Sequence, residues 1–311
     1  MRAINLPVFL RPWLAGWLAL AGTAGPLLVD AGATGATLRI ALAQPFVEPG
    51  HVEKNIEAMK PLIAESAGRG AKLVVFSECA LTGYDLKGVG AKAALKLDAP
   101  ELATVADLAR RLGVAILAGF HEQLEGRLFN SAAVFFPNGH RVIQRKHLIM
   151  APERAACPDI AGAPRERTFF EVDGFRCAVL ICSDALIPGI YEDLAAAKCD
   201  AVILIAAGAG SETFGVRQSE LSVPAARAKW LDSSLVYIDR ESVARAIRLD
   251  LAHVAVNQSG WNPASGYFQP GGSSIIDRTG TVSGVIPARF VFEHLQPDLA
   301  VGHITRAVPT R

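Results

Sequence analysis

The stretch FRCAVLICSDALIPGIYEDLAAAKCDAVILIAA, residues 175–207, carries the pattern from which the fold is predicted. Its two apolar runs, 175–182 and 200–207, flank a segment with helical character at 188–198. Apolar runs without polar alternation are typical of strands whose sheet is covered on both faces. The stretch therefore predicts an α/β unit, with Cys182-Ser183-Asp184 at the end of its first strand.

The same alternation of strands and helices extends outward in both directions. Asn138-Gly139 is a strong hairpin signal, and Asp173-Gly174 separates two further apolar runs. Hairpins mixed with βα units predict mixed sheets rather than purely parallel ones. The remaining strands are expected at 38–44, 72–78, 114–120, 131–137, 140–146, 167–172, 253–258, 273–277 and 281–286, and the helices at 51–67, 101–112 and within 217–252.

Composition describes a chain that folds on an apolar core of its own. Of 311 residues, 51% are apolar and 20% charged, and the net charge is +1. Such content excludes a disordered chain, and a near-zero charge gives no basis for nucleic-acid binding. Five cysteines without a C-x-x-C pair exclude a disulfide scaffold and a zinc ribbon. We expect one domain over residues 37–311.

The first 36 residues differ from the rest. Arg2 and Arg11 precede eighteen uncharged residues, Pro12 to Val29, and the small residues Ala31-Gly32-Ala33 follow. A basic start, a short apolar core and an A-x-A-like site are typical of a secretory leader. The segment is therefore expected to be a signal peptide or a membrane anchor, which predicts an exported, periplasmic or membrane-anchored protein. A misassigned start, or a simple apolar N-terminal helix, on a cytoplasmic protein stays an open alternative.

Several common catalytic motifs are missing from the sequence. It contains no phosphate loop of the G-x-x-x-x-G-K type, no G-x-G-x-x-G after a strand, no G-x-S-x-G elbow and no H-E-x-x-H. Nucleotide-dependent chemistry, an α/β-hydrolase serine and a metalloprotease site therefore have no support.

Three reactive side chains come at the ends of predicted strands: Glu78, Lys146 and Cys182. In α/β sheets, chemistry concentrates at strand ends and in the loops beyond them. A thiol needs a base to become a thiolate, and a carboxylate in an apolar pocket has a raised pKa suited to that role. The lysine can stabilise a developing oxyanion. Each residue alone is ordinary, as we expect for the mid-strand Cys177, but together they predict a nucleophilic site.

With these residues in place, the chain resembles the carbon–nitrogen hydrolase (nitrilase/amidase) superfamily from about Leu38 to Ile286. The resemblance implies a four-layer αββα sandwich that forms homodimers or larger homo-oligomers, and a cysteine thioester mechanism without metal or cofactor. The stretches that carry it are VVFSECALTGY (74–84), GRLFNSAAVFFPNG (126–139), RKHL (145–148), VLICSDALIPGIYEDLAAAKCDAVIL (179–204), ARAIRLDLAHVAVNQSG (244–260) and GGSSIIDRTG (271–280).

The resemblance also implies a role for single residues. Glu78 matches the general base, Lys146 the catalytic lysine and Cys182 the nucleophile. Glu153 is the carboxylate near enough to match a second family glutamate. The Lys146 ammonium and the backbone N–H of Ser183 are the expected oxyanion donors.

This sequence departs from the family pattern beside Glu78 and after Cys182. Serine occupies position 77, where proline is usual, and position 183, where an aromatic is usual. Residues 186–189 read Leu-Ile-Pro-Gly, where many members have arginine and then Phe-Pro-Glu. Because arginine near this loop often holds a substrate carboxylate, its loss argues against an acidic substrate. Arg154, Arg165 and Arg217 are the possible replacements.

The expected activity is an amidase that cleaves a neutral carboxamide or carbamoyl amide, a small molecule, through a thioester. A nitrilase using the same triad is one alternative. A catalytically silent or acyl-transferring member, tethered at a membrane through residues 1–36, is another.

Overall fold

The computed structural model describes residues 35–164, 167–208, 223–225, 234–262, 267–288 and 297–306. Residues from Gly35 onward form one compact unit. The predicted leader or anchor lies, except for its last two residues, outside the described residues. Within the described ranges, no helix is long and apolar enough to cross a membrane.

The first sheet is mixed and has six strands in the order β13-β1-β2-β3-β4-β5. Its central strands β1, β2 and β3 are parallel, whereas β4, β5 and β13 pair antiparallel to their neighbours. The pairing of β13 with β1 joins the two ends of the described chain and was not predicted. The bounds are β1 (Ala36–Gln44), β2 (Leu73–Val75), β3 (Ala115–Leu124), β4 (Arg127–Phe135), β5 (Arg141–Arg145) and β13 (Asp298–Arg306).

The second sheet has seven strands in the order β10-β11-β9-β8-β7-β6, with β12 paired to β11. Here β7, β8 and β9 are parallel and the flanking pairs are antiparallel. Both sheets are thus mixed, as predicted, although β10 was not foreseen. The bounds are β6 (Phe169–Val172), β7 (Phe175–Ile181), β8 (Ala201–Ala206), β9 (Ala252–Asn257), β10 (Ser259–Asn262), β11 (Tyr267–Ile276) and β12 (Val282–Ala288).

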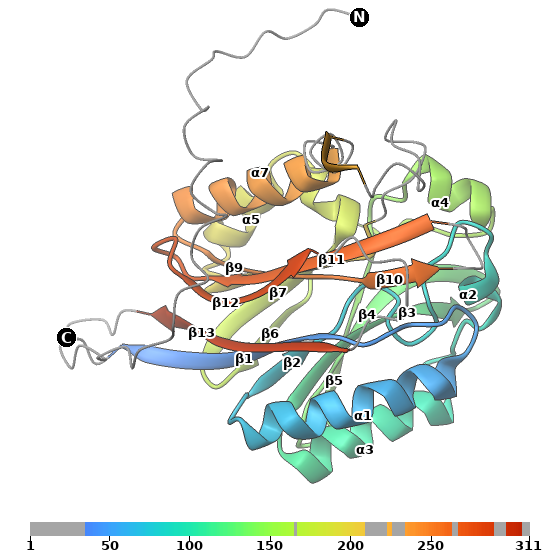
Figure 1. The fold of residues 1–311 in the computed structure, drawn as a ribbon, viewed down its shortest axis with the longest axis horizontal. Coiled ribbons are helices and arrows are strands. Elements are labelled where there is room, and N and C mark those ends of the chain that lie inside the picture. Colours follow the sequence, from blue (N-terminus) through green and yellow to red (C-terminus); the bar gives the residue numbers. More distant parts are fainter. Residues whose placement is uncertain are drawn as a thin grey trace, which may run out of the picture. The chain divides into compact units, whose positions relative to one another are not determined.

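Helices cover the outer face of each sheet and complete four layers, αββα (Figure 1). Helices α1 (Val52–Gly68) and α3 (Pro100–Leu112) pack on the first sheet, and α5 (Ile190–Ala196) and α7 (Ser234–Arg248) on the second. This confirms the predicted sandwich. Three short pieces, α2 (Val89–Lys92), α4 (Ala151–Ala156) and a 3₁₀ turn over Cys182–Leu186, lie in connecting segments.

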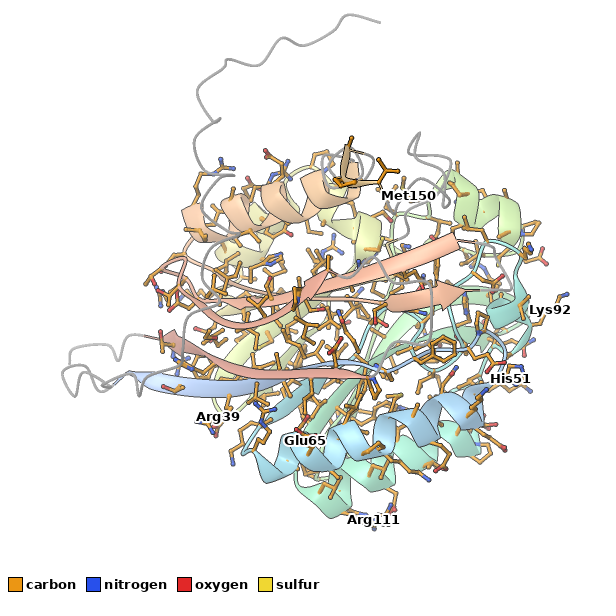
Figure 2. The ribbon with its side chains drawn as sticks, in the orientation of Figure 1. Arg39, His51, Glu65, Lys92, Arg111 and Met150 are labelled. Atoms are coloured by element: carbon orange, nitrogen blue, oxygen red, sulfur yellow. The ribbon has the colours of Figure 1, made fainter. Side chains whose placement is uncertain are left out.

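Helix α3 shows how local sequence defines an element. Proline occupies its first position, where a missing N–H costs nothing, and Gly113 ends it at a φ of 65°. Its buried side chains recur at helical spacing and pack against the first sheet, while charged residues such as Arg111 lie on the outer surface (Figure 2).

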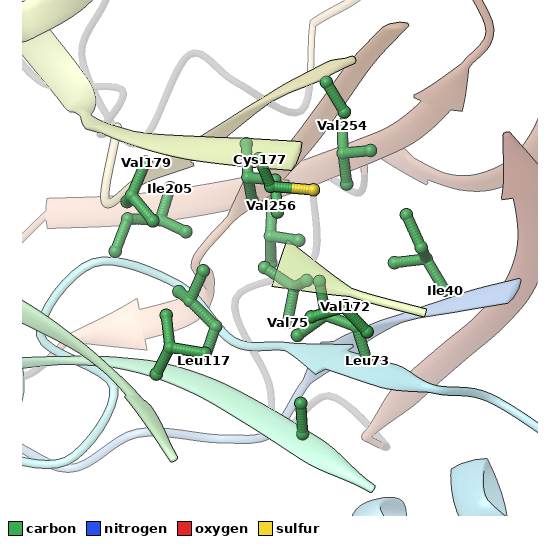
Figure 3. Packing of buried hydrophobic residues seen from close by; sticks show 14 of the residues in the cluster. Ile40, Leu73, Val75, Leu117, Val172, Cys177, Val179, Ile205, Val254 and Val256 are labelled. Carbon is green, nitrogen blue, oxygen red and sulfur yellow. The ribbon is translucent and has the colours of Figure 1, made fainter. Parts of the chain in front are cut away.

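The central core lies between the two sheets. Ile40, Leu73 and Leu117 of the first sheet meet Val179 and Val254 of the second within one apolar cluster (Figure 3). Cys177 belongs to the same cluster and has no exposed surface, as expected for a small apolar core residue. Because both inner faces are apolar, polar side chains gather beyond the strand ends.

Candidate active site

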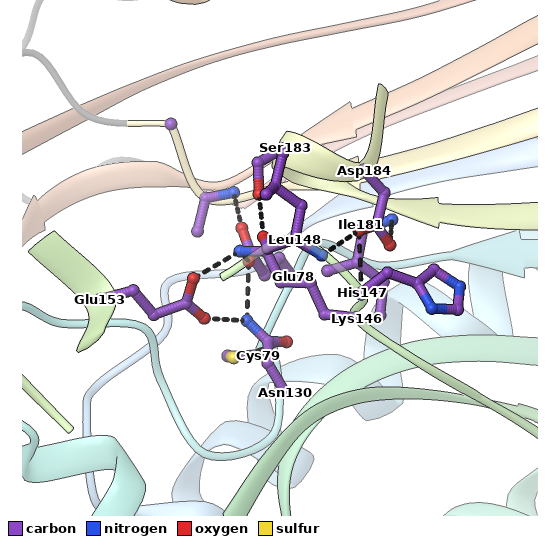
Figure 4. A network of polar contacts seen from close by, with 12 residues as sticks. Glu78, Cys79, Asn130, Lys146, His147, Leu148, Glu153, Ile181, Ser183 and Asp184 are labelled. Atoms are coloured by element: carbon purple, nitrogen blue, oxygen red, sulfur yellow. Dashed lines mark hydrogen bonds and ion pairs between the residues drawn. The ribbon is translucent and has the colours of Figure 1, made fainter. Parts of the chain in front are cut away.

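Glu78, Lys146 and Glu153 come together in a buried cluster, although they lie on three different segments (Figure 4). Glu78 follows β2, Lys146 follows β5, and Glu153 lies in α4. The three residues are at most 2% exposed. The sequence indicates Glu153 only by its position seven residues after Lys146. In the structure, its carboxylate accepts a hydrogen bond from that lysine.

Glu78 is positioned by close packing of the chain against β3. The N–H of Gly119 donates to the carbonyl of Ser77 at 3.2 Å, and the N–H of Leu81 donates to the carbonyl of Gly119 at 3.0 Å. A Cβ at position 119 would lie 2.9 Å from the carbonyl carbon of Glu78. Only glycine allows this approach, so a residue in the middle of β3 sets the place of the acid.

The Lys146 ammonium bridges the two carboxylates. Its Nζ donates to Oε1 of Glu78 at 2.7 Å and to Oε2 of Glu153 at 2.8 Å. Burial opposes the charge on Lys146, but Glu78 and the other anionic groups nearby hold its pKa well above the usual value. Burial raises the pKa of Glu78, although Lys146 acts in the opposite direction. The lysine is therefore a fixed cation beside an acid whose affinity for a proton is increased.

Asn130 on β4 is a member of this cluster that sequence reasoning did not assign to the site. Its Nδ2 donates to Oε1 of Glu78 and to Oε1 of Glu153, both at 2.8 Å. The backbone N–H of Ala207, after β8, donates to Oε2 of Glu78 at 2.8 Å. In the sequence, Asn130 is notable only because it lies in the stretch 126–139, one of those that carry the family resemblance. It is 52 residues from Glu78 along the chain, so no local pattern predicts the contact.

Cys182 directly follows β7 and begins the 3₁₀ turn with a left-handed backbone, at a φ of 49°. This conformation is uncommon for a residue with a Cβ, and such strain is concentrated at functional sites. Cys182 is partly exposed, whereas Cys79, Cys157, Cys177 and Cys199 are buried. Burial and then the Glu78 charge raise the pKa of the Cys182 thiol, while Lys146 acts to lower it. Cys182 therefore lies within the electrostatic field of the cluster.

Ser183 and Asp184 tie the loop after Cys182 to the loop after Lys146 (Figure 4). Oδ1 of Asp184 accepts the backbone N–H groups of His147 and Leu148, each at 2.9 Å. The Ser183 hydroxyl donates to the Leu148 carbonyl at 2.5 Å. These bonds fix the lysine relative to the cysteine.

Of the arginines considered as partners for a substrate carboxylate, Arg165 and Arg217 lie outside the described residues. Arg154 lies on α4, where its guanidinium donates to the carbonyl of Ile160 at 3.4 Å. Leu186 is 40% exposed. Among the described residues, no group of three or more His, Cys, Asp or Glu side chains is arranged to hold a metal ion.

Several known proteins are similar to this chain in sequence. A hydrolase encoded in the pqqF 5′ region of Pseudomonas protegens is 28% identical over 173 residues, 54% of this chain and 59% of that protein. The chain thus spans little more than half the length of that relative. An omega-amidase of Xenopus tropicalis is 29% identical over 217 residues, 68% of this chain and 76% of that protein.

Among solved structures, an amidase from Nesterenkonia sp. superposes with a TM-score of 0.68 at 20% identity, covering 91% of this chain and 95% of that one. At that identity the likeness establishes the fold. The family model for carbon-nitrogen hydrolases matches residues 39–289. The chain therefore belongs to the carbon-nitrogen hydrolase family.

Proposed function

We propose that the protein is an amidase that hydrolyses a small neutral carboxamide or carbamoyl amide through a thioester on Cys182. The observation that carries the proposal is the buried Glu78–Lys146–Glu153 cluster, linked by the Asp184 bonds to the loop that begins at Cys182. Two carboxylates and one ammonium give the cluster one net negative charge. Such a cluster can accept one proton while retaining a cation for a developing oxyanion.

In the first half-reaction, the Cys182 thiol transfers its proton to Glu78 and the sulfur attacks the amide carbonyl carbon. The resulting oxyanion is stabilised by the Lys146 ammonium, which donates two of its three N–H groups to Glu78 and Glu153, and by the backbone N–H of Ser183. The tetrahedral intermediate collapses, the C–N bond breaks, and ammonia or an amine leaves with the proton from Glu78.

In the second half-reaction, a water molecule gives one proton to Glu78 and its oxygen attacks the thioester carbonyl. Collapse of the second intermediate breaks the C–S bond, releases the carboxylic acid and returns the proton to sulfur. Glu153 holds Lys146 in place throughout and exchanges no proton with the substrate.

Ammonia release from a panel of neutral amides tests the amidase activity. A matching set of nitriles tests whether the same triad hydrolyses a carbon–nitrogen triple bond. Cys182→Ala should abolish turnover without loss of folding, because it removes little volume. Cys182→Ser should be nearly as inactive, since an alcohol needs a stronger base. Cys177→Ala is the matched control and should keep its activity.

A covalent adduct tests the nucleophile separately. A solved mutant of the Nesterenkonia amidase carries the acetamide moiety of fluoroacetamide on its active-site cysteine. Intact-mass measurement after incubation with fluoroacetamide should show one added acetamide group in this protein and none in Cys182→Ala. More than a few per cent of residual turnover in Cys182→Ala would show that the mechanism is wrong.

We also propose that the protein acts as a homodimer or larger homo-oligomer, and that residues 1–36 export it or anchor it to a membrane. The exposed apolar side chains of Leu148 and Met150 favour burial against a second copy. Light scattering during size-exclusion chromatography tests assembly. Mass spectrometry from the native host tests export, since a mature chain shorter by roughly 30–36 residues indicates cleavage.

A further inference from the structure

The hydrogen bonds that the described residues donate to Glu78 leave one of its acceptor positions open. An ionised carboxylate offers about four lone-pair positions. Oε1 of Glu78 accepts from Lys146 at 2.7 Å and from Asn130 at 2.8 Å, which fills its two positions. Oε2 accepts the Ala207 N–H at 2.8 Å. Within the described part of the chain, the one position without a donor lies on Oε2.

Asn130 has the properties needed to hold two carboxylates together. One amide nitrogen carries two N–H groups, and these reach Glu78 and Glu153 at the same distance, 2.8 Å. Because the amide is neutral, it binds both acids without changing the charge of the cluster. A second cation at this position would neutralise the negative charge that attracts the thiol proton.

A buried chain of polar groups orients the Asn130 amide from behind. The Cys79 thiol donates to Oδ1 of Asn130 at 3.5 Å and lies 3.7 Å from Nε2 of His121. Nδ1 of His121 lies 2.9 Å from Oγ1 of Thr82. All four residues are at most 3% exposed.

One protonation pattern gives each of these four side chains a hydrogen-bond partner. The Thr82 hydroxyl donates to Nδ1 of His121, the protonated Nε2 donates to sulfur, and the Cys79 S–H donates to Asn130. The other neutral tautomer would direct the S–H to His121 and leave Oδ1 of Asn130 without this donor. Burial lowers the pKa of His121 to about 4, so the ring is neutral near pH 7. The chain thus keeps the Asn130 amide nitrogen facing the acids.

We propose that Asn130 is a positioning residue that aligns Glu78 with Glu153 and directs the proton of the Cys182 thiol to Oε2 of Glu78. The role of that proton rests on the proposed function. Asn130 acts through Glu78 and does not itself contact the substrate.

Loss of Asn130 should change the pH at which Glu78 works as a base. The titratable groups around Glu78 are Lys146 after β5, Glu153 on α4, Cys182 at the end of β7, and Cys79 and Tyr84 in its own loop. Hydrogen bonds donated to a carboxylate stabilise its ionised form. Without the Asn130 bond, Glu78 binds a proton more tightly, so activity is lost at a higher pH on acidification.

The test measures the rate of Cys182 alkylation by iodoacetamide against pH, with Cys182→Ala as the blank. This rate reports removal of the thiol proton and needs no amide turnover. Asn130→Leu should raise the pH of half-maximal rate by about one unit, and lower the rate on the acid side about tenfold. The same shift should appear in kcat/KM.

Asn55→Leu is a matched control. Asn55 on α1 is 1% exposed and also donates two hydrogen bonds and accepts one, all with backbone atoms. This variant should lose stability but keep the wild-type half-maximal pH. Should Asn130→Leu fail to fold, Cys79→Ala, which removes the donor to Asn130 and places no β-branched side chain at the φ of 49°, should shift the profile in the same direction by less.

A folded Asn130→Leu, or in its place a folded Cys79→Ala, with the wild-type half-maximal pH would overturn the inference. If Asn130→Leu shifts the acid limb of alkylation but the wild type releases no ammonia from any amide, the proposed function fails while the positioning role stands. If amides are hydrolysed and the limb does not move, the positioning role alone fails.

Discussion

His253 on β9 and Tyr191 on α5 stack with their ring centroids 6.5 Å apart, at an interplanar angle of 23°. Neither ring nitrogen of His253 has a hydrogen-bond partner among the described residues. Burial lowers the pKa of His253 to about 4, as it does for His121. Between pH 6.5 and 4 the folded protein therefore binds fewer protons than the unfolded chain. Stability from these two groups is present above that window and is lost as the pH falls through it.

Replacing His253 with phenylalanine should stabilise the protein. The change removes two buried polar atoms without partners, which cost about 1–3 kcal/mol in proteins, and keeps a ring of similar shape. The free energy of unfolding in urea should rise at neutral pH. It should also fall less on acidification, because one of the two histidines with a lowered pKa is gone and roughly half of their joint contribution goes with it. His140→Phe, at an exposed position, should keep the wild-type acid dependence. A His253→Phe protein that is less stable at every pH would contradict this view.

At the scale of elements, β3 and the segment after β2 form a contact in which no side chain fits. A Cβ at Gly119 would lie 2.3 Å from the backbone nitrogen of Cys79 and 2.8 Å from the carbonyl oxygen of Ser77. Both are backbone atoms, so the neighbour cannot move aside by changing a rotamer. The strand and the segment that carries the acid are therefore positioned as one unit.

Gly119→Ala should displace Glu78 and lower kcat/KM about a hundredfold, because a misplacement of about 1 Å in an active site has an effect of that size. Overpacking should also reduce the free energy of unfolding by about 1–3 kcal/mol. Gly68→Ala is the control, since nothing lies within 4 Å of its added Cβ. Equal kcat/KM in the two variants would show that β3 does not position the acid.

At the scale of the whole molecule, the candidate site is assembled from both sheets. Lys146, Asn130 and Glu78 belong to the first sheet or the segments that follow its strands, whereas Cys182 and Ala207 follow strands of the second. The bond from the Ala207 N–H to Glu78, at 2.8 Å, crosses between them. The packing of one sheet on the other therefore sets the relation between acid and thiol.

The loop after Cys182 should select substrates by charge. Leu186 and Gly189 are uncharged where the family resemblance implies arginine and glutamate in many members, and Leu186 is 40% exposed. A neutral amide should therefore have a higher kcat/KM than an ω-amide acid of the same size, because a carboxylate needs a cationic partner to offset its desolvation. Initial rates of ammonia release on the pair measure this. Preference for the acid would indicate an arginine that holds the carboxylate.

The four layers should fold without the first 34 residues. Residues from Gly35 onward form a compact unit, and both sheets are covered by helices of that unit. A variant that begins at Gly35 keeps the pairing of β1 with β13, which starts at Ala36. It should match the full chain in urea midpoint and in kcat/KM. A large drop in either would show that the core depends on the removed segment.

Sequence periodicity was sufficient for the mixed sheets, the helices α1 and α3, and the placing of Glu78, Lys146 and Cys182 at strand ends. Strand and helix patterns depend on neighbours within a few residues, so one segment contains the whole signal. The turns at Asn138-Gly139 and Asp173-Gly174 could also be predicted locally, because backbone with a positive φ favours glycine, asparagine and aspartate.

Only the tertiary structure revealed the antiparallel pairing of β13 with β1, the role of Gly119 as a spacer, and the contacts of Asn130 with both acids. Each depends on segments far apart in the chain, such as Ala36 and Arg306 in the sheet or Asn130 and Glu78 in the site. Such contacts form because burial of the apolar faces brings the sheets together and every buried polar group then needs a partner. No local pattern in the sequence records which partner that is.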